Sequence, residues 1–357
     1  MTDNNENKVL NVPHLRFPEF SGEWENTELQ YIAPNICSGK DKPTSNGTVA
    51  LYGSTGIIGM TRLASYNEEI VLVARVGANA GQLQITTIPC GVTDNTLIIN
   101  AKEWNRYIYY YLQHYNLNRL VFGSGQPLIT GSMLKKLKII YGEESERNKI
   151  VNLLCLLDER IATQNKIIED LKKLKSAISE RLFKSVKGST VLLSDLCDIV
   201  KGKQINGENL SDSGNYYVMN GGTEPSGYYD NYNVEASTIS ISEGGNSCGY
   251  VQFNTSPFWS GGHCYSIQNI ADKVDNMYLY HYLKSNEDAI MKLRIGSGLP
   301  NIQKKDLAMF KIIVPKIEWQ IKISTFLSSL ERKAEIEERI QNVMQKQKLY
   351  LLQQMFI

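Results

Sequence analysis

The sequence predicts an α+β protein in which two repeated globular domains of mixed helix and strand are joined by two long helices. These helices are expected to pair as an antiparallel coiled coil with pseudo-twofold symmetry. The first reason is a duplication, because residues 122–140 (FGSGQPLITGSMLKKLKII) return as residues 295–313 (IGSGLPNIQKKDLAMFKII) with nine of nineteen positions identical. The second is that each copy holds short β-branched runs between glycine-rich turns. The third is that each copy ends in a segment without Gly or Pro that carries apolar residues in heptads.

Matching segments occur in the same order in both halves and divide the chain into five parts. Residues 36–40 (ICSGK) match residues 199–203 (IVKGK), and Gly77 and Gly81 match Gly245 and Gly249 in the second half. The parts are an N-terminal leader, a first globular domain (head 1), a first long helix, a second globular domain (head 2) and a second long helix. Their expected bounds are residues 1–20, 21–142, 143–185, 186–313 and 314–357.

Each head is expected to contain short strands, turn-rich connections and one short helix. Runs rich in Val, Ile, Leu and Thr predict the strands, and the Gly- and Asn-rich segments between them predict turns. The expected strands are residues 70–74, 83–86 and 96–99 in head 1 and residues 238–242, 250–253 and 264–267 in head 2. The expected short helices are residues 104–113 and 277–284.

The two long helices are expected to pack against each other. Heptad spacing relates Ile150, Leu157, Leu171 and Ile178 in the first helix, and Ile323, Leu330, Met344 and Leu351 in the second. A helix of about 40 residues is ~60 Å long, whereas the connection at residues 186–192 reaches at most ~25 Å. Head 2 therefore has to begin at the far end of the first helix. The second helix can only run back, so the pair is antiparallel.

Composition indicates an ordinary soluble protein that is cytoplasmic. The chain has 357 residues, 42% of them hydrophobic and 21% charged, and a formal net charge of +1. No apolar run reaches the ~20 residues that span a bilayer, and the polar N-terminus MTDNNENKVL does not resemble a secretory signal. The six cysteines form no C-x-x-C pair, which favours reduced thiols over a disulfide or zinc framework.

Catalytic motifs are missing from the sequence. It contains no G-x-x-x-x-G-K-[ST], H-E-x-x-H or G-x-S-x-G, and no N/D-P-P-Y/F tetrapeptide of amino-methyltransferases. The four histidines accompany no evident nucleophile or ligand set. We therefore expect no catalytic residues and no metal site, which leaves a hidden nuclease or methyltransferase as a disfavoured alternative.

Several of these segments resemble specificity subunits of type I restriction–modification systems. They are the leader sequence at residues 15–24 (LRFPEFSGEW), residues 71–81 (VLVARVGANAG), the duplicated Gly-Ser-Gly-x-Pro and the helix ends in Leu-Phe and Met-Phe. The order of these pieces in both halves carries the resemblance over nearly the whole chain. One departure is that residues 315–320 (PKIEWQ) keep a Pro-x-x-x-x-Gln start of the spacer helix, whereas residues 142–147 (GEESER) do not.

The resemblance implies a non-catalytic DNA-binding subunit with two target-recognition domains and two spacer helices. Such a subunit reads a bipartite, asymmetric target in double-stranded DNA. It implies two methyltransferase subunits that clamp onto the helices and methylate adenine with S-adenosylmethionine, and two motor-nuclease subunits that use ATP and Mg. Those cofactors are expected on the partners and none on this chain. The alternative is a coiled-coil scaffold with two protein-binding heads.

DNA-binding candidates were chosen among polar residues on turn-rich segments at or beside matched repeat positions. Lys and Arg suit phosphates, and Arg, Asn, Gln, Ser and Thr suit base edges. The candidates are Lys40, Lys42, Ser54, Thr55, Arg62, Arg75 and Asn79 in head 1, and Lys201, Lys203, Gln204, Asn220, Thr223 and Asn246 in head 2. Position 75 matches Glu243, and opposite charges at equivalent sites fit heads that read different sequences, although drift on a solvated loop would produce the same pattern.

Net charge argues against strong DNA binding by the chain alone. Residues 21–142 hold ten Lys and Arg against eight Asp and Glu, a net of +2, and residues 191–313 hold nine against thirteen, a net of −4. Phosphate neutralisation supplies much of the affinity for DNA, so we expect the partners to provide most phosphate contacts.

Two further expectations concern the helices. On the first helix, Leu154, Ile161, Ile168 and Leu182 are expected either to extend the apolar stripe to one side, where methyltransferase subunits bind, or to thicken the seam with the second helix. Each Gly-Ser-Gly-x-Pro segment is expected to shape the turn that feeds a long helix, with a phosphate-contacting turn as the alternative.

Overall fold

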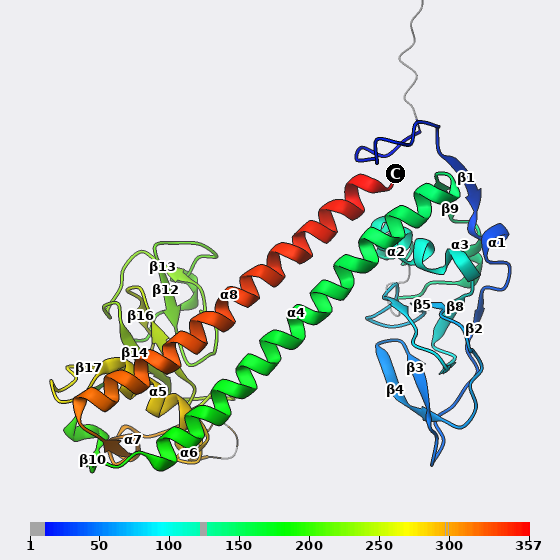
Figure 1. Ribbon diagram of the computed structural model, residues 1–357. Helices are drawn as coiled ribbons and strands as arrows, with labels where there is room; N and C mark the ends of the chain where they lie inside the picture. The colour runs from blue at the N-terminus through cyan, green and yellow to red at the C-terminus, as the bar shows by residue number, and fades with distance from the viewer. Residues whose placement is uncertain (1–10, 122–126, 297, 299) are drawn as a thin grey trace, which may run out of the picture. The chain divides into compact units, whose positions relative to one another are not determined.

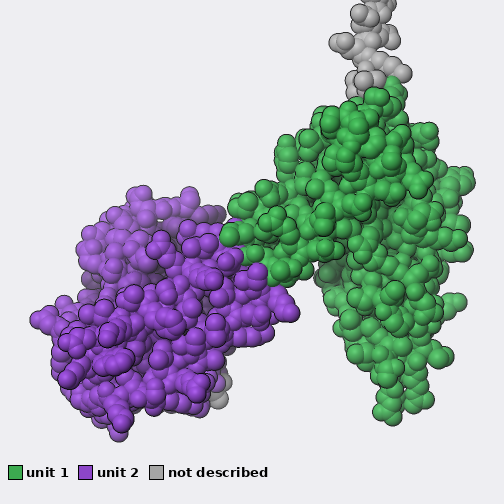
Figure 2. Space-filling view, in the orientation of Figure 1, with its two compact units in different colours: residues 1–165, 340–357 green, residues 166–339 purple. Residues whose placement is uncertain are grey.

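The structure is a computed structural model that describes residues 11–121, 127–296, 298 and 300–357. It divides into unit 1, residues 1–165 and 340–357, and unit 2, residues 166–339 (Figure 2). Unit 1 contains head 1 with the beginning of the first long helix and the end of the second. Unit 2 contains head 2 with the remainder of both helices.

The strands follow the same order in both heads, with short helices between some of them (Figure 1). Head 1 contains β1 (Glu25–Glu28), α1 (Leu29–Ile32), β2 (Cys37–Ser38), β3 (Val49–Gly53), β4 (Gly56–Thr61), β5 (Val71–Ala74), β6 (Leu83–Ile85), β7 (Cys90–Val92), β8 (Thr96–Ile99), η1 (Lys102–Trp104), α2 (Asn105–Tyr115), η2 (Leu117–Leu120), α3 (Gly131–Lys135) and β9 (Lys138–Tyr141). Head 2 contains β10 (Ser189–Leu192), η3 (Leu193–Asp195), β11 (Asp198–Lys201), η4 (Gly207–Asn209), β12 (Tyr216–Met219), β13 (Tyr228–Tyr229), β14 (Thr238–Ser242), β15 (Val251–Asn254), β16 (Trp259–Ser260), β17 (Cys264–Gln268), α5 (Asn276–Ser285), α6 (Glu287–Met291), α7 (Lys304–Ala308) and β18 (Lys311–Val314).

Sheet topology confirms the duplication. Each head has a four-stranded antiparallel sheet, in the order β2-β8-β5-β6 or β11-β17-β14-β15. Each has a three-stranded sheet with one parallel pair, β4-β3-β7 or β13-β12-β16, and a two-stranded sheet, β1-β9 or β10-β18. The six strands and two short helices expected from the sequence are present, with bounds that differ by at most two residues.

The central strand of each head separates two faces of the core. In β5, Val71 and Val73 pack with helix α2, whereas Leu72 packs with the three-stranded sheet. In β14, Ile239 faces the helix side, while Ser240 on the other face binds Asn254 Nδ2 at 2.9 Å. The unbroken VLVA run in head 1 therefore reflects two apolar faces, and the alternating TISIS run in head 2 reflects one apolar and one polar face.

The long helices are α4 (Glu144–Ser185) and α8 (Ile317–Met355), and their antiparallel pairing is confirmed inside each unit. In unit 1, Asp158 Oδ1 pairs with Lys348 Nζ at 2.6 Å, and Asn165 further along α4 contacts Gln341 earlier on α8. In unit 2 the same reversal relates two ion pairs, Lys172–Glu338 at 2.6 Å and Lys175–Glu331 at 2.7 Å.

The seam of α4 requires a correction to the expected partner-binding residues. Leu154 is fully buried in the core of unit 1 and Ile168 is 6% exposed, so neither lies on an open surface. Ile161 is half-buried, and Leu182 is half-buried against the core of unit 2. The burial of Leu154 and Ile168 agrees with the alternative interpretation that they thicken the seam, whereas the role of Ile161 and Leu182 in partner binding stays a prediction. The exposed apolar residues of α4 are Leu156, Ile167 and Leu174 instead.

The two long helices begin with different side chains that serve a similar purpose. Gln320 is fully buried, and its amide donates to the Pro315 carbonyl at 2.8 Å and accepts from the Asp275 N–H at 2.9 Å. At the matching place in α4, Arg147 donates to the Gly142 carbonyl at 3.1 Å, and its guanidinium lies 3.7 Å from the ring centroid of Trp104. The departure from Pro-x-x-x-x-Gln is therefore compensated by a longer side chain.

The leader supplies the remaining support at the start of α4. Glu146 has a side chain that is 1% exposed, and it accepts from Arg16 Nε at 2.7 Å and from Trp24 Nε1 at 3.0 Å. Gly142 leaves room for this carboxylate, since a Cβ there would lie 2.2 Å from Glu146 Oε2. The Leu15 N–H also donates to the Gln354 carbonyl at 2.8 Å, so the leader joins the start of α4 to the end of α8.

Candidate nucleic-acid interface

A glycine turn follows the central strand of each head and is held in the same way in both. Gly77 and Gly245 have φ values of +81° and +76°, a conformation that favours glycine. Their N–H groups donate at 3.0 Å to the carbonyls of Pro127 and Pro300, which end the duplicated Gly-Ser-Gly-x-Pro segments. The turn therefore presents its backbone and neighbouring side chains at one edge of each central sheet.

The position of these prolines corrects an expectation. Residues 122–126, 297 and 299 of the duplicated segments lie outside the described residues. In the described part, each proline closes the glycine turn of its own head, and a short helix and a strand separate it from the long helix. The two described prolines therefore do not form the turn that feeds the long helix.

In head 2 the candidate residues gather around a buried carboxylate. Glu243 is 7% exposed, and its Oε1 accepts from Lys201 Nζ at 2.7 Å and from the Tyr265 hydroxyl at 3.1 Å. His263 Nδ1 lies 3.8 Å from Glu243 Oε2, which has no hydrogen-bond partner among the described residues. Burial raises the pKa of Tyr265, and the Glu243 charge raises it further, so the phenol stays a donor. The Lys201 ammonium group is therefore exposed and is held in place by the buried Glu243 carboxylate.

Other head 2 candidates lie on the neighbouring loops. The Asn220 Oδ1 accepts from the His263 N–H at 3.1 Å, and Gln204 lies against Gly262, where a Cβ would come within 2.4 Å of its Oε1. Lys203 is exposed two residues beyond Lys201. Thr223 and Asn246 are also exposed, on the loop after β12 and on the glycine turn. The structure thus brings Lys201, Gln204 and Asn220 together around residues 261–263.

In head 1 the residue that matches Glu243 is Arg75, so the charge at this one position is opposite. Arg75 Nη1 lies 3.3 Å from Ser38 Oγ, and Ser38 is the repeat partner of Lys201. The Asn95 carbonyl accepts from the Arg75 N–H at 3.0 Å and from Ser54 Oγ at 3.1 Å, which places Ser54 and the exposed Thr55 beside this arginine. Each head therefore has one cation beside its glycine turn. In head 1 it is Arg75, directly after β5, and in head 2 it is Lys201, at the end of β11.

The remaining head 1 candidates spread away from this cluster. Lys40 and Lys42 are exposed on either side of Asp41, whose carboxylate accepts from the Val92 N–H at 2.8 Å. Arg62 donates to the Ser45 carbonyl at 3.3 Å, at the end of the β3–β4 hairpin opposite its turn. Arg62 is therefore not part of the group around Arg75.

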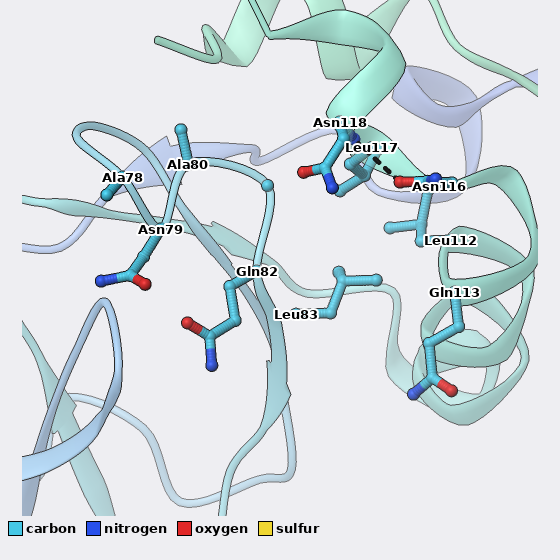
Figure 3. A pocket seen from close by; sticks show the side chains of 11 residues that line it. Ala78, Asn79, Ala80, Gln82, Leu83, Leu112, Gln113, Asn116, Leu117 and Asn118 are labelled. Atoms are coloured by element: carbon cyan, nitrogen blue, oxygen red, sulfur yellow. Dashed lines mark hydrogen bonds between the residues drawn. The ribbon is translucent and has the colours of Figure 1, made fainter. Parts of the chain in front are cut away.

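A polar hollow of about 450 Å³ lies between the glycine turn of head 1 and the end of α2 (Figure 3). Asn79 and Gln82 line it from the turn, and Gln113 and Asn118 line it from the helix side. Carboxamides both donate and accept, the combination that recognises adenine edges. Of these residues only Asn79 was predicted, because nothing in the spacing of the others distinguishes them from surface amides.

Four of the cysteine thiols are buried. Burial raises the pKa of the Cys90, Cys197, Cys248 and Cys264 thiols, which makes them poor nucleophiles. Within residues 11–121, 127–296, 298 and 300–357, no three His, Cys, Asp or Glu side chains gather where they could hold a metal ion. In the same part of the chain no helix is long and apolar enough to cross a membrane.

Comparison with known proteins identifies the family. The family model described as "Type I restriction modification DNA specificity domain" matches residues 9–173 and residues 187–346. The chain belongs to this family. The family's role is recognition of DNA sequence in restriction–modification, without catalysis of its own, and this role disfavours a general scaffold.

Individual members agree with this assignment. A type I specificity subunit of Mycoplasma genitalium is 34% identical over 122 residues, which are 34% of this chain and 31% of that protein. One from Mycoplasma pneumoniae is 32% identical over 145 residues, which are 40% of this chain and 38% of that protein. The matches therefore span about a third of these relatives. The crystal structure of an M. genitalium S subunit has the same fold, with a TM-score of 0.73, 19% identity and coverage of 97% of this chain and 99% of that one.

Proposed function

We propose that this chain reads a bipartite, asymmetric target in double-stranded DNA, one half-site with each head. Residues 21–142 and 186–313 would be the target-recognition domains, and residues 143–185 and 314–357 the spacer helices. The observation that carries the proposal is that two heads of one topology hold different charges at one matched point, Arg75 in head 1 and Glu243 with Lys201 in head 2. A shared scaffold with different side chains suits an asymmetric target.

The chemistry at this point supports base reading. A guanidinium can bind the O6 and N7 atoms of guanine together, and such a bidentate contact discriminates by about 1–3 kcal/mol. Lys201 on its carboxylate offers a more localised cation. The proposed contact residues remain those predicted from the sequence: Lys40, Lys42, Ser54, Thr55, Arg62, Arg75, Asn79, Lys201, Lys203, Gln204, Asn220, Thr223 and Asn246.

The proposed partners are two adenine methyltransferase subunits and two motor-nuclease subunits. Family membership implies partner subunits of a restriction–modification complex. S-adenosylmethionine, ATP and Mg would be bound by those partners, and the complex would act on DNA in the cytoplasm. This division of labour agrees with the lack of catalytic motifs in the chain.

The methyltransferase surface is proposed on exposed apolar stripes of the long helices, in place of the seam residues expected first. In unit 2 the stripe comprises Ile167 and Leu174 of α4 and Trp319, Phe326 and Ile336 of α8. In unit 1 it comprises Leu156 of α4 and Ile340, Val343 and Tyr350 of α8. On α8 these residues recur at heptad spacing beside the seam, so each helix surface could pack against a further helix.

Phe326→Asp with Ile336→Asp tests this surface. Both side chains are 47% exposed, so the double variant is expected to stay folded and to lose methyltransferase binding in a pull-down. Asn342→Asp with Gln345→Asp is the matched control, because both residues are exposed on α8 and lie about 100° or more around the helix from Phe326 and Ile336. Retained binding in the folded double variant would place the partner surface on the heads.

Mapping of methylated adenines across a genome, with and without this chain, tests the DNA-reading function itself. The expected map shows one two-part sequence that loses its methylation when the chain is removed. Replacement of residues 21–142 with another family head should then change one half of that sequence. A change in both halves, or no sequence dependence at all, would overturn the proposal.

A further inference from the structure

Cations are concentrated in one matched segment of each head. Residues 119–138 contain Arg119, Lys135, Lys136 and Lys138 and no Asp or Glu, a net of +4. Residues 292–311 contain five Lys and Arg and one Asp, also a net of +4. Since residues 21–142 total +2 and residues 191–313 total −4, the remainder of the heads carries −2 and −8. We name residues 119–138 and 292–311 the basic segments.

In head 2 the cations of the basic segment surround a shared hollow. Lys292, Arg294 and Lys311 line it together with Met309 and the half-buried Asp306. Lys304 and Lys305, at the start of α7, are exposed on the same segment. Among the described residues none of these five cations forms an ion pair, and the acid that precedes Lys292 in the sequence is Asp288, one helical turn away. The charge is therefore available to a ligand.

Head 1 repeats the arrangement at equivalent positions. Arg119 and Lys138 are the repeat partners of Lys292 and Lys311, and both are exposed. Lys136 is exposed and Lys135 is half-buried at the end of α3. The cations have thus stayed on this segment in both heads, although the total charge of the heads differs in sign.

Each basic segment is fastened to the glycine turn. In head 2, Ile295 bridges to Asn301, Asn301 bridges to Gly244, and the Ile302 N–H donates to the Glu243 carbonyl at 2.8 Å. In head 1, Val76 bridges to Leu128, and the Ile129 N–H donates to the Arg75 carbonyl at 2.9 Å. The cations therefore begin next to the residues proposed to read bases.

We propose that the cations of the basic segments, all of them described residues, are the phosphate-contacting groups of the two heads. This inference rests on the proposed function and deepens it by separating the residues that hold the DNA backbone from those that read sequence. Unpaired exposed ammonium and guanidinium groups suit phosphate oxygens, which carry no sequence information. It also accounts for DNA binding by a head of net charge −4, because every acidic group of head 2 except Asp306 lies outside the segment that meets the duplex.

Salt dependence of DNA binding tests the proposal with the whole chain in complex with its methyltransferase partner. The variant is Lys292→Gln with Arg294→Gln, and the control is Lys187→Gln with Lys273→Gln, two exposed lysines of unit 2 outside the basic segment. Each lost phosphate contact reduces the slope of log Kd against log salt by about 0.9. We expect the variant slope to fall by one to two on cognate and random duplexes alike, with the methylated sequence unchanged and the control slope equal to wild type.

Each other outcome has a definite meaning. An unchanged slope, or a changed target sequence, would overturn the phosphate assignment. Weakened methyltransferase binding with an unchanged slope would overturn it in favour of an acidic protein partner. Lys292→Arg, which keeps the charge, should restore the slope and distinguishes charge from misfolding. If the wild-type complex shows no sequence preference, the proposed function fails, but the slope on the random duplex still decides this inference.

Discussion

The short helix of each head is hydrogen-bonded to an acid on one long helix, and that acid pairs with a lysine on the other. The acid lies on α4 in unit 1 and on α8 in unit 2. In unit 1 the Tyr110 hydroxyl donates to Asp158 of α4 at 2.9 Å, and Asp158 pairs with Lys348 of α8. In unit 2 the Tyr280 hydroxyl donates to Glu331 of α8 at 3.1 Å, and Glu331 pairs with a lysine of α4, Lys175. Asp158 and Glu331 are repeat partners, as are Lys175 and Lys348.

The neighbouring pair shows where the two attachments differ. Tyr110 also lies 3.5 Å from Cys155 Sγ, and the repeat partners of these two residues are His281 and Ser328, with His281 Nε2 at 2.9 Å from Ser328 Oγ. The attachment of the short helix to the long helices is therefore present in both repeats, although some of the residues that form it differ. At the glycine turns, by contrast, the matched residues Arg75 and Glu243 have opposite charges.

The largest expected effect compares the two helix starts. Glu146→Ala would leave Arg16 without its partner, and loss of one member of a buried pair costs about 4 kcal/mol. Gln320→Ala removes a neutral amide and should cost only ~2 kcal/mol. Hydrogen exchange of the first turns of α4 and α8 measures both. Equal losses would mean that the leader adds nothing to the start of α4.

The next effect is a pH dependence that should be stronger in unit 2, because burial lowers the pKa of His281 in α5 far, while it also lowers the pKa of His114 in α2 of unit 1. Burial lowers the pKa of His281 to about 4, from 6.5 in the unfolded chain. Between these values the unfolded chain holds a proton that the folded chain lacks, so stability falls as pH drops from 6.5 to 4. The loss reaches ~3 kcal/mol by pH 4. Exchange of α5 amides should accelerate over that window more than exchange of α2 amides, and His281→Gln should abolish the difference.

A smaller effect concerns the exchanged charges. Lys201→Ser with Glu243→Arg gives head 2 the pair found in head 1, Ser38 and Arg75. One base position in the head 2 half-site should change its preference by roughly 2 kcal/mol, while the other half-site stays the same. Selection of bound duplexes by sequencing measures this. An unaltered preference in a folded variant that still binds DNA would remove this position from base reading.

The smallest effect compares an exposed ion pair between the long helices, Lys172–Glu338, with the pair that attaches the short helix of head 2, Lys175–Glu331. Lys172 and Glu338 have side chains that are 62% and 41% exposed, and Lys172→Ala should cost about 0.5 kcal/mol. Lys175→Ala acts on a lysine that is only 21% exposed and should cost more, because Glu331 also receives the Tyr280 hydroxyl. Chemical denaturation of both variants gives the comparison. Equal costs would show that the attachment is no more than another surface pair.

Sequence alone determined the duplication, the strand runs, the short helices and the antiparallel pairing of the long helices. These depend on local patterns, namely β-branched runs such as residues 71–74 and heptads such as Ile150 and Leu157, together with the reach of a short connection. A duplicated order needs no tertiary knowledge, because it compares the chain with itself.

Tertiary structure decided which side chains face each other. The sequence left open whether Leu154 and Ile168 lie on an open side of α4 or in its seam, and only the packed structure shows that both are buried. It also could not pair Glu243 with Lys201, 42 residues apart, or Arg16 with Glu146, 130 apart. Nor could it place Pro127 on the Gly77 turn. Such contacts depend on how loops fold back in space, and no short-range periodicity records them.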